Sequence, residues 1–89
     1  MLRIQRFASG GAVLFALSGR IETENVTELR SLVAAESMPI LFDLKEVSLV
    51  SREVVQFLAQ CEDTGIIIQN CPAYIREWIA RESANPNPS

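Results

Sequence analysis

Two short segments that are almost entirely apolar constrain the fold of this chain most strongly. They are ILFDL at residues 40–44 and IIIQ at residues 66–69. Runs of this length without polar alternation are typical of strands that are covered on both faces of a sheet. Between them, residues 52–63 place apolar side chains at helical spacing, and Gly65 ends the predicted helix. A strand–helix–strand unit joins parallel strands through a right-handed crossover, so we expect both segments in one parallel sheet.

The N-terminal part of the chain predicts a hairpin followed by a helix. MLRIQRF and AVLFALSG have the pattern of strands, and the ASGG between them is a turn signal. From Thr23, the expected N-cap, apolar residues recur at helical spacing until Met38-Pro39 ends the helix. A third helix, with Pro72 in its first turn, follows the last strand. The element order β-β-α-β-α-β-α predicts a small α/β sandwich, with three helices on a four-stranded mixed sheet whose first strand is an antiparallel edge.

The composition is that of one globular domain. The chain has 89 residues, of which 48% are hydrophobic and 21% charged, enough for one modest core. We expect the domain to span residues 1–82 and the polar tail at residues 83–89 to be disordered. The formal net charge of −3 argues against nucleic-acid binding, because phosphate contacts dominate such affinities. AVLFAL is too short for a signal peptide or a membrane span, so we expect a soluble cytoplasmic protein that does not insert into membranes.

The sequence lacks histidine, the residue that most often serves as a general base in catalysis. Neither Ser51 nor the cysteines Cys61 and Cys71 have an identifiable activating partner. The two cysteines match no usual zinc spacing, and no Gly-rich phosphate loop precedes a helix. We therefore expect a binding protein and not an enzyme, with no metal, no cofactor and two reduced thiols.

Two motifs, in this order and element context, resemble those of STAS domains. LSGRIE, residues 17–22, is similar to the family's strand-end motif Leu-x-Gly-x-Leu/Ile-Asp/Glu, which leads into the first helix. ILFDLKEVSLV, residues 40–50, is similar to the family's central strand and the loop after it. The resemblance covers residues 2–81 and implies the STAS fold. It also implies a role in protein interaction, since the family includes bacterial anti-sigma factor antagonists, domains of anion transporters, stressosome components and small subunits of lipid-transport ABC systems.

The resemblance places a regulatory site at the start of the second helix. Anti-sigma factor antagonists have Asp-Ser-Ser/Thr-Gly there, and a partner kinase phosphorylates the first hydroxyl residue. The matching residues here are Ser51, Arg52, Glu53 and Val54, so Arg52 replaces the phosphoacceptor. An alignment shifted by one residue would leave Ser51 as a phosphorylation site. The resemblance implies a partner-binding surface made of Asp43, Ser48, Ser51, Arg52 and Glu53.

Two interpretations of this junction stay open at the level of sequence. In the first, Ser51 is an ordinary N-cap, while Arg52 and Glu53 are solvated and pair with each other or with Glu46. In the second, Arg52 reaches an acidic group on a partner. A cation in the first helical turn is unfavourable against the helix dipole, and such a local inconsistency at a family's docking site is a place to look for function.

The third helix offers a second candidate interface. Tyr74 and Trp78 are four residues apart and share a face with Ile75 and Ile79. Either this stripe packs on the sheet as part of the core, or part of it stays exposed and serves a homodimer or partner contact.

Three functions compete. The leading hypothesis is a STAS-type interaction module that binds a serine-kinase-type anti-sigma factor or a similar regulator, with the usual phosphoserine switch missing or altered. The alternative is a small subunit of an ABC-type lipid-transport assembly, docked on its ATPase. The third is a nucleotide or small-ligand sensor, for which the sequence shows no basic or Gly-rich phosphate site.

Overall fold

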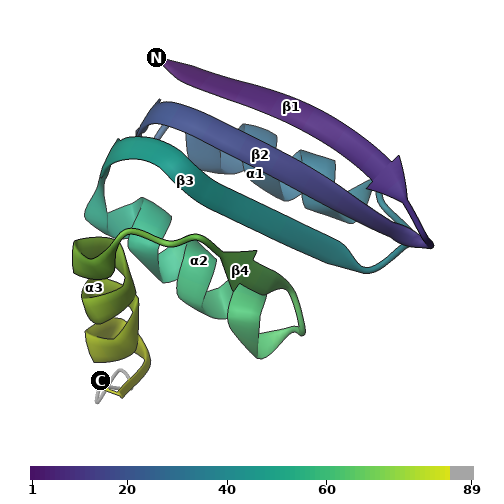
Figure 1. The fold of residues 1–89 in the computed structure, drawn as a ribbon. Helices are drawn as coiled ribbons and strands as arrows, with labels where there is room; N and C mark the ends of the chain where they lie inside the picture. Colours follow the sequence, from purple (N-terminus) through teal and green to yellow (C-terminus); the bar gives the residue numbers. More distant parts are fainter. Residues whose placement is uncertain (85–89) are drawn as a thin grey trace.

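The computed structural model describes residues 1–84, and its N-terminal part is the predicted hairpin (Figure 1). β1, Leu2–Ser9, pairs antiparallel with β2, Ala12–Ile21. Gly10 and Gly11 connect the two strands with φ angles of 61° and 84°. Two consecutive positive φ angles match the twist of the flanking strands, and only glycine adopts both without strain.

The other three strands of the sheet run parallel to one another, as predicted. β3, Ile40–Val50, pairs with β2, and β4, Ile67–Gln69, pairs with β3, so the strand order is β1-β2-β3-β4. The crossovers carry α1, Asn25–Ala34, and α2, Arg52–Asp63, while α3, Ala73–Ala84, follows β4. The element order and the mixed sheet confirm the fold class that periodicity predicts.

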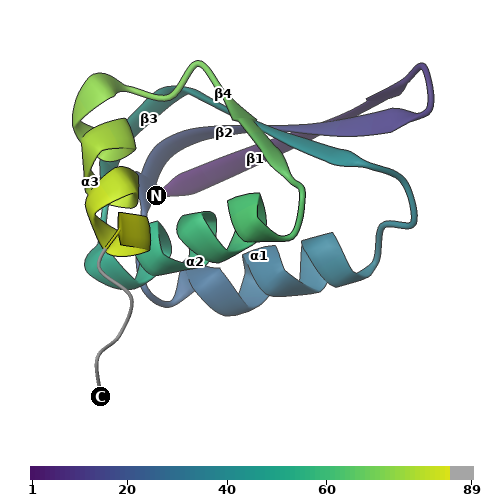
Figure 2. The ribbon, with the colours of Figure 1, turned by 90° about the horizontal axis from the view of Figure 1, so that it is seen from below.

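The helices gather on one side of the sheet. α1 and α2 run beneath it, and α3 stands at one end against α2 (Figure 2). The largest fully buried side chains between these layers are Phe15, Phe42, Leu17, Ile21, Leu29, Leu44, Leu58, Ile75 and Ile79. They come from two strands and all three helices, so a single core holds every layer together.

The prediction that β3 and β4 are covered on both faces is wrong. No described helix packs on the second face of the sheet, which we call the open face. Leu41 of β3 is only half-buried, and the side chain of Ile67 in β4 is 58% exposed. Since side chains alternate between the faces of a strand, an apolar run fills one core with every second residue and leaves the others on the surface.

β3 is also longer than the segment predicted from its apolar run. Residues 45–50, expected to form a loop, continue the strand and pair with β2 as far as Ile21 opposite Val50. The pairing contains two register shifts, the second of them between Gly19 and Arg20. Such irregularities let a strand bend while it stays paired with the neighbouring strand. The alternation of side chains along a strand does not reveal them in the sequence.

Two helix starts differ from the prediction. Thr23 is not the N-cap of α1, because Glu24 takes that position and has no side-chain cap bond. The hydroxyl of Thr23 is engaged by Ser51 and Glu53 at the start of α2. Pro72 precedes α3 and does not begin it, and its carbonyl accepts two N–H groups of the first helical turn.

The remaining predictions concern the C-terminus, membranes and metals. The tail predicted at residues 83–89 lies outside the described residues, apart from its first two residues, which belong to α3. None of the described helices is long and apolar enough to cross a membrane. Within residues 1–84 no group of three or more potential metal ligands comes together.

Candidate functional site

Ser51 joins β3 to α2 and is the N-cap of that helix. Its backbone is extended, with φ −89° and ψ 168°, and its Oγ accepts the Val54 N–H at 3.4 Å. The Ser51 N–H donates to the Ile21 carbonyl at the end of β2, at 3.3 Å. Ser51 is therefore an N-cap, as the first interpretation expects, and both sides of the residue are tied to the scaffold.

A second hydroxyl bridges Ser51 to Glu53. The Thr23 hydroxyl donates to Glu53 Oε1 at 2.9 Å and lies 3.1 Å from Ser51 Oγ. Because that donation uses the only hydroxyl proton of Thr23, Ser51 must be the donor between the two hydroxyls. The Ser51 hydroxyl thus donates to Thr23 and accepts from Val54.

Glu53 carries the negative charge of this junction. Its carboxylate accepts its own backbone N–H, which is the main cause of a lowered pKa, followed by the bond from Thr23 and the nearby charge of Arg52. A carboxylate in the first turn also faces the positive end of the helix dipole. Glu53 is exposed and ionised at neutral pH, so it presents a fixed anion to solvent.

Arg52 points to α3, which corrects the expected pairing with Glu46 or Glu53. Its Nε lies 3.6 Å from Glu82 Oε2, and its side chain is 68% exposed. The contact forms because α3 packs against α2. Arg52 and Glu82 are far apart in the sequence, so no local pattern predicts that they meet. An exposed ion pair of this length contributes about 0–1 kcal/mol, so Arg52 can leave Glu82 for another carboxylate at little cost.

The aromatic stripe of α3 divides between core and surface. Ile75 and Ile79 are buried, and Trp78 is half-buried against the core, while the side chain of Tyr74 is 46% exposed. The Tyr74 hydroxyl donates to the Ser48 carbonyl at 2.8 Å. This bond brings the second predicted interface next to the first, so both belong to one end of the molecule.

Asp43 does not belong to that end. It lies on β3 opposite Ala16 and Gln69, and its Oδ1 accepts the Lys45 N–H at 2.9 Å. Of the five residues predicted to bind a partner, the structure brings Ser48, Ser51, Arg52 and Glu53 together and leaves Asp43 on the open face.

Three residues beside Ser51 were missed from the sequence. Arg20, Glu22 and Leu49 line a shallow hollow of about 370 Å³, together with Ile21, Val50 and Ser51. Leu49 is 53% exposed, an unusual position for a large apolar residue. For Arg20 and Glu22, the sequence signal that could have identified them was the end of LSGRIE, where these two polar residues flank a single apolar residue. We define the junction surface as Arg20, Glu22, Ser48, Leu49, Ser51, Arg52, Glu53 and Tyr74.

Comparison with solved structures decides the fold. The anti-sigma factor antagonist SpoIIAA, in its unphosphorylated form, matches with a TM-score of 0.64 at 16% identity, over 84% of this chain and 79% of that chain. The chain has a STAS-like fold. A protein from Shewanella loihica with a SpoIIAA-like fold matches with a TM-score of 0.50 at 19% identity, over 94% of this chain and 76% of that one. Neither a protein-family model nor a curated protein sequence matches the chain.

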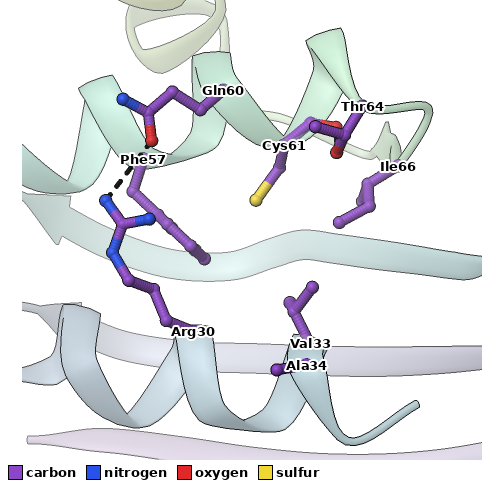
Figure 3. Close-up of a pocket in the computed structure, with 8 residues that line it drawn as sticks. All are labelled: Arg30, Val33, Ala34, Phe57, Gln60, Cys61, Thr64 and Ile66. Carbon is purple, nitrogen blue, oxygen red and sulfur yellow. Dashed lines mark hydrogen bonds between the residues drawn. The ribbon is translucent and has the colours of Figure 1, made fainter.

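The STAS-like domain also has an apolar groove between α1 and α2, away from the junction surface (Figure 3). The groove has a volume of about 240 Å³, and Val33, Cys61 and Ile66 contribute to its lining. The Arg30 guanidinium lies 5.2 Å from the centre of the Phe57 ring and donates to Gln60 at 3.3 Å. A cation over an aromatic face beside apolar walls is a ligand-like feature on the helical side.

Cys61 in this groove is an unreactive thiol. Both cysteines are free, and burial raises the pKa of Cys61 to about 12 and also raises the pKa of half-buried Cys71. A thiolate is the reactive form, so at neutral pH neither residue has the character of a nucleophile. The structure thus agrees with the expectation of two plain thiols.

The raised pKa of Cys61 predicts a loss of stability in alkali. The thiol has a pKa near 9.0 in the unfolded chain and near 12 in the folded chain. The stability that the folded state gains from the neutral thiol is therefore fully present below pH 9 and is lost as the pH rises toward 12. The release of one proton on unfolding limits the loss of unfolding free energy to about 1.4 kcal/mol per pH unit. Solvent screening reduces this value, so the wild type should lose somewhat less than that relative to Cys61→Ala. Urea unfolding of both proteins at several pH values between about 8 and 11 measures this difference. A difference that stays constant over this range would contradict the prediction.

Proposed function

We propose that the chain is a non-catalytic interaction module in the manner of an anti-sigma factor antagonist. Its partner would be a serine-kinase-type anti-sigma factor or a similar regulatory protein, bound through the junction surface. The observation that carries the proposal is the likeness to SpoIIAA combined with a polar, exposed β3–α2 junction in the same chain. The proposed docking does not depend on phosphorylation of the chain.

The chemistry of the junction supports a docking site that has lost its phosphoserine switch. The residue at the acceptor position is Arg52, which cannot carry a phosphoester. The neighbouring Ser51 hydroxyl is already a donor to Thr23 and an acceptor from Val54. A phosphate on Ser51 would break the first bond and would add about two negative charges close to the ionised Glu53.

The exposed side chains of the junction surface suit a protein partner. Tyrosine and arginine are the residue types that most often dominate binding energy at interfaces. Tyr74 and Leu49 supply exposed apolar area, and Arg52 makes a long contact of 3.6 Å with Glu82. A partner that offers a carboxylate could therefore recruit Arg52 without a large desolvation cost.

The test is an affinity pull-down from a lysate of the source organism, with Arg52→Glu beside the wild type and retained proteins identified by mass spectrometry. We expect the wild type to retain a kinase-like regulatory ATPase, and Arg52→Glu to bind it about tenfold less tightly or worse, because like charges then meet at the interface. Arg30→Glu is the matched control, since it makes the same charge change at an exposed arginine of the groove.

Three outcomes would contradict the proposal. Loss of the partner with Arg30→Glu alone would place docking at the groove and favour a different site. Recovery of transporter permease and ATPase subunits would support the alternative of a transport assembly. A bait whose intact mass is about 80 Da higher, with the phosphate on Ser51, would show that the switch survives.

A further inference from the structure

Four large apolar side chains form a row across the open face of the sheet. In the strand register, Phe7 of β1 lies opposite Leu14 of β2, Leu14 lies opposite Leu41 of β3, and Leu41 lies opposite Ile67 of β4. Their neighbours along the strands, such as Phe15 and Phe42, point to the other face and are buried. The four residues therefore share one face and span all four strands, and we call them the apolar row.

The apolar row is exposed to an extent that is unusual for side chains of this size. Phe7 is 52% and Ile67 58% exposed, and Leu14 and Leu41 are half-buried. All the described helices lie on the opposite side of the sheet or at its end (Figure 2). A contiguous apolar patch of this kind on a small domain marks a surface that binds something.

The rest of the open face is polar and balanced in charge. Beside the row, Arg3, Asp43, Lys45 and Glu46 line a shallow hollow of about 240 Å³. These four residues carry two positive and two negative charges, whereas the whole chain has a net charge of −3. A second molecule with the same net charge can approach this neutral face without the repulsion that other surfaces of the chain would impose.

We propose that the open face binds a second copy of this chain, sheet against sheet. A two-fold axis parallel to the strands lays β1 of one copy over β4 of the other, so the apolar row packs on itself. Phe7 then faces Ile67 of the second copy, and Leu14 faces Leu41 of the second copy. Sheets packed in this way interdigitate their side chains at the spacing found inside β-sandwiches.

The size of the face agrees with a weak dimer. The four strands have 8, 10, 11 and 3 residues, an average of eight. With strands about 4.8 Å apart and residues of about 3.3 Å, the sheet face covers roughly 500 Å² per copy. Two copies bury about 1,000 Å² in total, which is near the lower limit for a specific interface. The dimer should therefore form and dissociate with concentration. It would leave both junction surfaces free, so that one dimer could engage two partner sites.

Sedimentation velocity and light scattering over a concentration series test this proposal on the full chain. We expect the average mass to rise from one chain toward two over a range of roughly 1–500 µM, as for an interface near the lower size limit. Ile67→Lys and Phe7→Lys should each raise the dimer dissociation constant about tenfold or more, because a charge is placed in the apolar contact. Ala80→Lys is the matched control, since it places the same charge at an exposed residue of α3, away from the open face.

The proposal is overturned if the wild type stays monomeric throughout the series. It is also overturned if Ile67→Lys and Phe7→Lys remain dimeric, or if Ala80→Lys dissociates the dimer equally. Circular dichroism and thermal melting of each variant distinguish dissociation of the dimer from unfolding. Ile67 and Phe7 lie on opposite edge strands, so either variant alone can test the proposal if the other fails to fold. None of these results bears on the pull-down outcome for Arg52→Glu, so the two proposals fail independently.

Discussion

Replacing Phe42 by alanine is expected to lower the free energy of unfolding by about 3–5 kcal/mol. Phe42 is 1% exposed and lies in β3 at the centre of the sheet. Its ring centre is 6.1 Å from that of Phe15 in β2 and 6.4 Å from that of Phe57 in α2, so one side chain joins two strands and a helix. Such aromatic pairs add about 0.5–1.5 kcal/mol each to the burial itself. A cavity at this point would weaken all three elements.

Phe7→Ala is the matched control, because it removes the same ring from a position that is 52% exposed. We expect it to change the unfolding free energy by well under about 1 kcal/mol when measured at concentrations where the chain is monomeric. Denaturant unfolding of both variants beside the wild type gives the comparison. A domain of this size has a total stability of about 5–15 kcal/mol, so Phe42→Ala should move the midpoint strongly. Equal midpoints for the two variants would show that Phe42 does not lie at the centre of the core.

Local periodicity carried most of the fold prediction. In α2, apolar residues at helical spacing predicted an inner side containing Val54, Val55, Leu58 and Cys61, and all four are buried. The strand–helix–strand order then fixed the parallel pairing without any knowledge of contacts. These features depend on residues close together in the sequence, which is why the sequence alone sufficed.

The open face could not be predicted in the same way. A continuous apolar run such as ILFDL predicts a strand, but the run is the same whether helices or a second molecule cover the outer side chains. Leu41 and Ile67 were assigned to a covered strand on this ground, and the structure leaves them on the surface. If the chain forms the proposed dimer, the apolar run reflects an interface between copies.

The sequence named residues at the β3–α2 junction but not the residues that surround them. The N-cap role of Ser51 was one of two interpretations open from the sequence, because a serine before an apolar helical pattern has a local signature. The bonds from Thr23 to Glu53 and from Tyr74 to Ser48 join residues 30 and 26 positions apart. Contacts of that kind depend on how the elements pack, and no spacing in the sequence encodes them.

Gly19 holds the end of β2 beside this site, and alanine at this position is expected to lower the unfolding free energy by about 2–4 kcal/mol. Gly19 has a φ of +87°, which side chains with a Cβ rarely adopt. A Cβ there would also collide with the backbone carbonyl of Met1, the residue before β1. Two residues later, the Ile21 carbonyl accepts the Ser51 N–H, so a shift of the strand end would disturb the N-cap of α2 as well.

Gly10→Ala separates the two causes, because Gly10 also has a positive φ, of +61°, but an added Cβ meets nothing within 4 Å. It should therefore lose only about 1 kcal/mol, the conformational part of the effect. Thermal melting should place Gly19→Ala below Gly10→Ala by several degrees, since each 1 kcal/mol shifts the midpoint of a domain this small by about 4–8 °C. Equal melting points would mean that β1 gives way to the new methyl group at no cost. The glycine of LSGRIE would then be needed only for its backbone angle, and not for the close packing of β1 against the strand that leads to Ser51.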